Sequence, residues 1–242
     1  MKKVLMILVF IFSNFAYSQA DLVIKGFEAY DRGDYPTALK YFKKACDLNE
    51  GKSCYGLGLM HENGDGLKKD IFKAVEFYRK ACDLNIGDGC HQLGILYEDG
   101  LGVKKDNFKA VELFRKACDL GSETDCANLG FMYVNGQGVK KDNFKAVEFF
   151  RKACDLNESS GCVNLGLMYV NGYGVKKDNF KAVEFFRKAC DLNKGAGCVN
   201  LGVAYVNGHG VRKDLYKALE YFGKACDLKY DKGCQNYARL KQ

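Results

Sequence analysis

The sequence predicts an all-α protein, a right-handed α/α solenoid in which short helices stack in pairs. Cysteines recur in pairs, eight residues apart within a pair and 36 residues apart from one pair to the next. The pentapeptide Lys-Ala-Cys-Asp-Leu recurs with the same period, and the apolar residues between the cysteines follow helical spacing. A fixed period of this length is typical of a repeat array, in which each unit buries its apolar face against its neighbours.

Each period contains two predicted helices, helix A and helix B. In one period they cover residues 160–171 and 178–192. The apolar arc of helix A extends past half of its circumference, so we expect neighbours to cover this helix on two sides. Asn164, Met168 and Asn171 fill the remaining face, which we expect to be exposed. Helix B is amphipathic, with a solvent face of charged residues.

The ends of the helices carry signals of their own. Gly172 stands where a left-handed residue would end helix A, and Gly174 permits a second turn. Asp178 is placed as the N-cap of helix B, and aspartate recurs at this position in the other long-loop repeats. A β-propeller or a β-helix is the alternative repeat architecture, but the helical spacing and the Lys-Ala-rich helix B disfavour it.

We expect six A/B pairs and one final helix A, in one continuous domain without linkers. The final helix would cap the stack with a polar face, as the end repeats of solenoids do. The expected repeats are residues 21–52, 53–88, 89–124, 125–160, 161–196 and 197–232, with the cap at 232–242.

Two motifs indicate the kind of repeat. Leu-Gly-x-x-Tyr occurs four times, and Ala-x-x-x-Phe/Tyr occurs six times, from Ala38 to Phe222. They resemble tetratricopeptide repeats, in which small residues such as Gly166 and Ala182 let the two helices approach closely. Four extra residues in the A–B loop, written Gly-x-Gly-Val-x-Lys-Asp, resemble the Sel-one-like variant. His61 in place of tyrosine and a missing proline at the repeat end depart from the pattern.

Residues 1–20 have the pattern of a secretory signal peptide. Two lysines precede an apolar run from Val4 to Phe12, and small and polar residues follow. Cleavage would fall after Ser18 or after Ala20. An uncleaved anchor is the alternative, but the run is short for a membrane span. We therefore expect a secreted protein, with the periplasm as the alternative, in a compartment that permits disulfides.

The cysteine pairs predict structural disulfides. Each Cys-x7-Cys joins the end of helix B to the start of the next helix A, and in a helical hairpin these positions lie close together. Zinc binding is the alternative, but zinc sites favour shorter spacings and need four ligands in one place. We expect no metal and no cofactor. The expected bridges are Cys46–Cys54, Cys82–Cys90, Cys118–Cys126, Cys154–Cys162, Cys190–Cys198 and Cys226–Cys234.

The formal net charge of the chain is +7, from 37 basic and 30 acidic residues. This surplus is small and looks evenly spread along the sequence, so we expect no nucleic acid partner. After the N-terminal run no stretch is long and apolar enough to cross a bilayer, so we expect no membrane span in the mature chain. We expect a monomer.

The export signal, the repeats and the cysteine pairs together resemble the Helicobacter cysteine-rich protein family over residues 21–242. This resemblance implies penicillin binding and slow hydrolysis of derivatives of 6-aminopenicillanic and 7-aminocephalosporanic acid. It also implies secretion and effects on host immune cells. The residues themselves give no catalytic centre, because Ser-x-x-Lys, Ser-Asp-Asn and Lys-Thr-Gly are absent and the three histidines are scattered. We assign no catalytic residue.

A row of asparagines on helix A predicts a ligand surface. They recur on its exposed stripe with an apolar residue between them, and we expect helix A to line the concave side of the stack. A carboxamide both donates and accepts, so a row of them can bind a peptide, or the amide and carboxylate of a β-lactam. Equally, they could cover a solvated face and cap the helix ends. The candidate residues are Asn128, Asn164, Asn200, Met132, Met168, Asn135, Asn171 and Asn207.

Two functional hypotheses follow. The first is an enzyme or binder that acts on β-lactams or on cell-wall-derived small molecules, and it rests on the family resemblance. The second is a non-enzymatic secreted scaffold that binds a peptide or a host protein in its groove. The residues support the second more directly, because catalysis needs preorganised groups and the sequence shows none.

Overall fold

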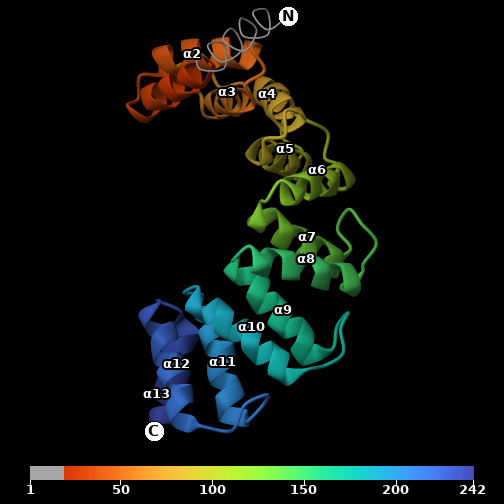
Figure 1. Ribbon diagram of the computed structural model, residues 1–242, viewed down its shortest axis with the longest axis vertical. Helices are drawn as coiled ribbons and strands as arrows, with labels where there is room; N and C mark the ends of the chain where they lie inside the picture. Colours follow the sequence, from red (N-terminus) through yellow and green to blue (C-terminus); the bar gives the residue numbers. More distant parts are fainter. Residues whose placement is uncertain (1–18) are drawn as a thin grey trace, which may run out of the picture. The chain divides into compact units, whose positions relative to one another are not determined.

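The computed structural model describes residues 19–242, and within this range every regular element is an α-helix. The predicted signal peptide lies outside the described residues, apart from its last two positions. Residues 19–31 form the first helical segment. The helices that follow (Figure 1) are α2 (Tyr35–Asp47), α3 (Gly51–Asn63), α4 (Ile71–Asp83), α5 (Gly87–Asp99), α6 (Asn107–Asp119), α7 (Glu123–Asn135), α8 (Asn143–Asp155), α9 (Ser159–Asn171), α10 (Asn179–Asp191), α11 (Gly195–Asn207), α12 (Leu215–Asp227) and α13 (Asp231–Lys241).

The helices alternate between the two predicted kinds. The even-numbered helices are B helices, and α3, α5, α7, α9, α11 and α13 are A helices. The bounds of α9 and α10 lie within one residue of those predicted for helix A and helix B. No helix among residues 19–242 is both long and apolar enough to cross a membrane.

The predicted helix ends are confirmed. Gly172 ends α9 with a φ of 72°, in the left-handed region. The side chain of Asp178 accepts a hydrogen bond of 3.1 Å from the backbone N–H of Lys181, which caps the start of α10. The same two devices recur in the other long-loop repeats, so each loop begins and ends in the same backbone conformation.

A glycine of helix A faces an aromatic ring of helix B in every repeat. A Cβ built on Gly130 would lie 2.5 Å from the ring of Phe150, and one on Gly202 would lie 2.6 Å from the ring of Phe222. These rings are buried, with exposed fractions of 2% or less. The predicted close approach of helices A and B is therefore confirmed, and it depends on the missing side chain of the glycine.

The predicted disulfides are present. Five bridges have Cα–Cα separations of 4.5–4.8 Å, and each joins a B helix to the next A helix. Cys118 and Cys126, the sixth predicted pair, are also disulfide-bonded, and no described cysteine is free. Six disulfides are typical of a protein that resides outside the cytoplasm.

The chain divides into two compact units, one ending at Leu120 and the other running from Gly121 to Gln242. In the second unit each helix packs against the next along the chain, from α7 to α13, and α9 also contacts the A helices α7 and α11. In the first unit the same succession runs from α2 to α6. The candidate site described below lies within the second unit.

The short B–A turns do not use proline. Asn157 and Asn193 stand one residue beyond the C-cap leucine and have φ values of 68° and 59°, in the left-handed region that asparagine tolerates. In the last turn this position is Lys229, with a φ of 57°. The missing proline of the repeat motif is thus replaced by a left-handed residue that ends helix B.

Candidate functional site

The candidate site lies on α7, α9 and α11, the A helices of the second unit. Each ends at a left-handed glycine, and each places one fully buried leucine in the core. Because the three helices have the same length and the same buried positions, equivalent residues face the same way relative to their own repeat. The exposed side of each helix is a stripe of residues at i, i+3 and i+7.

The predicted asparagines lie on this stripe. Those near the middle of each helix are half-buried, and those at the helix ends are exposed. The apolar residue between them is Phe131, Leu167 or Val203, each between 37% and 40% exposed. The stripe therefore reads Asn-Phe-Asn, Asn-Leu-Asn and Asn-Val-Asn, with residues 128, 164 and 200 as the first asparagines, and 135, 171 and 207 as the last.

The prediction that methionines separate the asparagines is wrong. Met132 and Met168 are only 4% and 6% exposed. The A helix α9 contacts two other A helices as well as the B helices on either side, so its exposed arc is narrower than two-sided packing would leave. The contacts with these additional A helices bury position i+4 and leave position i+3 exposed. The sequence does not distinguish the two positions, because both are apolar.

Two of the asparagines use their amide nitrogen within their own helix. Nδ2 of Asn164 donates to the carbonyl oxygen of Ser160 at 2.7 Å, and Nδ2 of Asn171 donates to that of Leu167 at 2.9 Å. In this conformation one of the two N–H donors of each side chain is already used, and the second N–H and the acceptor oxygen are left for a ligand.

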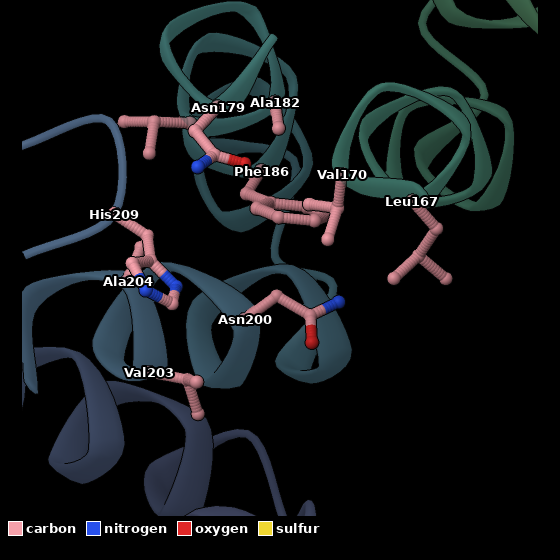
Figure 2. A pocket seen from close by; sticks show the side chains of 10 residues that line it. Leu167, Val170, Asn179, Ala182, Phe186, Asn200, Val203, Ala204 and His209 are labelled. Atoms are coloured by element: carbon pink, nitrogen blue, oxygen red, sulfur yellow. The ribbon is translucent and has the colours of Figure 1, made fainter. Parts of the chain in front are cut away.

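Asn200 lines a cavity of about 130 Å³ between α9, α10 and α11. Figure 2 shows Asn200 on α11 and His209 on the loop after it, with Asn179 of α10 across from them. These three side chains are the polar part of the lining. The walls are apolar and consist of Leu167, Val170, Ala182, Val183, Phe186, Val203 and Ala204.

His209 and Asn179 were not among the predicted site residues. They come together because the loop after α11 crosses the start of α10, where a Cβ on Gly210 would overlap the carbonyl oxygen of Asn179. His209 is the middle residue of Gly-His-Gly, and this position differs in every long loop while its neighbours repeat. The sequence signal that points to His209 is therefore a position that varies inside a repeated motif.

The cavity can bind but has few means of catalysis. Its lining contains no serine, cysteine, lysine or carboxylate, and His209 is its one titratable side chain. Among residues 19–242, no three His, Cys, Asp or Glu side chains are grouped so that they could hold a metal ion. Asn128, on α7, does not line this cavity, so the predicted asparagine row is brought to it only at Asn200.

His61 occupies the tyrosine position of its repeat and packs as a tyrosine would. Its ring stacks on Phe77 with the centroids 5.4 Å apart, as Tyr169 stacks on Phe185 at 5.6 Å. Burial lowers the pKa of His61, and the nearby Lys73 ammonium lowers it further. The surroundings of this histidine therefore support a packing role.

Six consecutive segments of the chain match the Sel1 repeat: residues 25–50, 51–86, 87–122, 125–158, 159–194 and 195–230. The chain belongs to the Sel1 repeat family. The resemblance indicated by the extended A–B loops is thus confirmed across most of the sequence.

Two solved structures share this Sel1 repeat fold. A Sel1 repeat protein from Oxalobacter formigenes is 25% identical, with a TM-score of 0.81 over 85% of this chain and 84% of that one. The protein c5321, a protective antigen of uropathogenic Escherichia coli strains, is 28% identical, with a TM-score of 0.81 over 89% of this chain and 47% of that one.

Curated relatives come from Helicobacter pylori. The protein named beta-lactamase HcpA is 43% identical over 54 residues, which is 22% of this chain and 22% of HcpA. The chain spans about a fifth of the length of the first Helicobacter relatives that it matches. The relation to the Helicobacter cysteine-rich proteins is therefore confirmed at the level of the repeat.

Proposed function

We propose that this Sel1 repeat protein is an exported, non-catalytic scaffold that binds an extended peptide across α9 and α11 of its second unit. The observation that carries the proposal is the apolar cavity beside Phe186, with Asn179, Asn200 and His209 at its edge. Repeat proteins commonly bind extended partners along the surface that successive repeats build. Export is supported by the six disulfides and by the pattern of residues 1–20.

The size of the cavity favours a peptide over a small molecule. Its volume is about 130 Å³, whereas sites for drug-sized ligands usually measure about 300–1,000 Å³. A dry protein cavity of about 150 Å³ holds one benzene molecule. The cavity therefore fits a single apolar side chain, such as leucine or phenylalanine, whereas a bicyclic β-lactam with its substituent would extend beyond it.

The polar residues at the edge suit the backbone on either side of that anchor. Asn179 and Asn200 each carry a donor and an acceptor, which match the carbonyl and N–H of a peptide bond. Leu167 and Val203 are part-exposed at the mouth and offer apolar contact to neighbouring side chains. An apolar anchor with polar contacts on its rim is the usual arrangement of a binding hot spot.

Selection from a random peptide library displayed on phage tests the proposal. We expect the selected peptides to share one large apolar residue, and their affinity to fall about tenfold or more when Val203→Lys places a charge at the mouth. Asn200→Ala should weaken binding, whereas Asn164→Ala is the matched control, because Asn164 lies outside the cavity lining. Peptides that lack a common anchor, or that bind the Val203→Lys protein unchanged, would contradict the proposal.

A second candidate function is β-lactam binding with slow hydrolysis, and the observation that favours it is the name of the HcpA relative. Nitrocefin turnover by highly purified protein is the test, with Asn128, Asn164 and Asn200 each changed to alanine. Turnover that persists through purification and falls with these substitutions would support hydrolysis. Turnover that disappears with purification would contradict hydrolysis and leave the scaffold as the one remaining candidate function.

A further inference from the structure

One edge of the second unit exposes large aromatic side chains in a regular pattern. Phe144, Phe180 and Tyr216 are the second residues of α8, α10 and α12, and they are between 73% and 88% exposed. Phe72 and Phe108 stand at the equivalent position in the first unit and are also exposed. A single exposed ring is ordinary, but the same exposed ring at the same place in each repeat is a surface feature that packing does not account for.

Basic side chains surround two of these rings. Phe144 shares an open hollow with Lys140, Lys141 and Lys145. Tyr216 shares the equivalent hollow with Arg212, Lys213 and Lys217. The acidic residue in each hollow is the aspartate that caps the helix, and its carboxylate already accepts from the backbone. Each hollow therefore presents three cations and two aromatic rings, one exposed ring at the start of the B helix and one tyrosine of the preceding A helix, over which one of the lysines lies.

The excess positive charge of the chain is concentrated in these loops, so the expectation of an even spread is wrong. The five long loops, taken through the first turn of the following helix, are residues 64–73, 100–109, 136–145, 172–181 and 208–217. Together they hold 15 basic and 6 acidic residues, a surplus of nine, whereas the whole chain has a surplus of seven. The remainder of the sequence is slightly acidic.

Neighbouring loops of the second unit touch, which makes the edge continuous. A Cβ on Gly174 would overlap the carbonyl oxygen of Asn143, at the start of the preceding B helix, and Gly210 meets Asn179 in the same way. The loops that join α7 to α8 and α9 to α10 project on the same side in Figure 1. The second glycine of each loop thus touches the backbone at the exposed aromatic residue of the preceding repeat.

We propose that this aromatic and basic edge, residues 136–145, 172–181 and 208–217, docks the protein onto an anionic lipid bilayer. Cations bind anionic headgroups, and aromatic rings insert at the level of the headgroup boundary. The choice of a bilayer over an acidic protein rests on uniformity: the same ring and cations recur in each repeat, and the hollows are open. A protein partner is usually held by a few dissimilar anchors in closed pockets, whereas a headgroup layer is chemically uniform.

The absence of tryptophan from the chain allows a sensitive test. Phe180→Trp places a single fluorophore on the edge, and Leu156→Trp places one at the other end of the helix pairs, where α8 ends. With vesicles of phosphatidylglycerol and phosphatidylcholine in equal parts, we expect a blue shift of the fluorescence of the Phe180→Trp protein alone. Phosphatidylcholine vesicles should give no shift for either protein. No shift in the Phe180→Trp protein, or an equal shift in the Leu156→Trp protein, would overturn the proposal.

Co-sedimentation with the same vesicles separates the two contributions. Changing Lys140, Lys141, Lys176 and Lys177 to glutamine should weaken binding about tenfold or more, since each cation near an anionic surface contributes. Changing Phe144, Phe180 and Tyr216 to serine should also weaken it, and Lys194→Gln with Lys232→Gln, away from the edge, should not. Soluble heparin is the comparison. If the aromatic substitutions leave the binding of both heparin and vesicles unchanged, the edge is only a contact for polyanions, which would contradict lipid docking.

Discussion

Gly166 of α9 and Phe186 of α10 approach so closely that no side chain fits between them. A Cβ built on Gly166 would lie 2.5 Å from Cε1 of the Phe186 ring, and the ring itself is buried and lines the cavity of the candidate site. The same pairing recurs in the other repeats, so this contact sets the spacing of helices A and B throughout the chain.

Gly166→Ala should destabilise the protein by about 1–3 kcal/mol, because the added methyl group overpacks a full interface. Gly223→Ala is the matched control. Gly223 lies inside α12, where an added Cβ meets only ordinary contacts at 3.5 Å or more, so this change should stabilise the protein by about 1 kcal/mol. Urea unfolding of both variants measures the difference, and equal effects would contradict the packing described.

Removal of one disulfide should be costly but local. We expect the double substitution Cys190→Ala with Cys198→Ala to lower the free energy of unfolding by about 2.6 kcal/mol, the chain-entropy value for a nine-residue loop. Because repeats contact mainly their neighbours, amide hydrogen exchange should accelerate most in α10 and α11. Acceleration spread evenly over the whole chain would show that the bridge does not act on its own junction.

Lys229→Asn should stabilise the protein. Lys229 holds a left-handed φ of 57° in the last B–A turn, at a position where four of the five earlier turns have asparagine and one has Gly121. Asparagine tolerates this region better than lysine does, and the difference is worth about 0.5–1 kcal/mol. Thermal unfolding measures the change, with Lys232→Asn in the regular helix α13 as the control. A gain in the control and none at position 229 would refute the explanation from backbone conformation.

His61 should make stability depend on pH. Its pKa is lowered in the folded protein, first by burial and then by Lys73. The unfolded chain therefore takes up the proton more readily, and the stabilisation present above about pH 6.5 is lost as the pH falls toward the folded pKa. His61→Tyr removes this loss. The stability difference between about pH 7 and about pH 5 should be smaller in the variant, and an unchanged difference would argue against a role for His61.

The architecture was predictable because its signals are local and repeated six times. The cysteine spacing, the capping aspartates and the left-handed glycines each fix a helix end within a residue or so, and their agreement leaves few other folds. Met132 and Met168 show where this reasoning fails. Which of two adjacent apolar positions is buried depends on contacts between A helices of different repeats, and these contacts leave no mark in the spacing.

The site was only partly predictable for a related reason. Asn200 was found because asparagine repeats on helix A, whereas Asn179 and His209 reach the cavity through a loop that crosses from one repeat to the preceding one. The aromatic and basic edge is hidden in the net charge of the whole chain, because the slightly acidic remainder offsets the surplus of the long loops. The concentration of charge becomes evident only when the long loops are compared with the rest of the chain.

The side-chain amide spectrum of ¹⁵N-labelled protein, titrated with a selected peptide, tests the binding site most directly. Substitution assigns the signals of Asn179, Asn200 and Asn164, and of Asn157 and Asn193 in the B–A turns, which do not line the cavity. The account predicts that the signals of Asn179 and Asn200 shift together as the peptide binds, while those of Asn157 and Asn193 stay in place. Saturable binding that leaves Asn179 and Asn200 unmoved would place the ligand elsewhere and contradict the account.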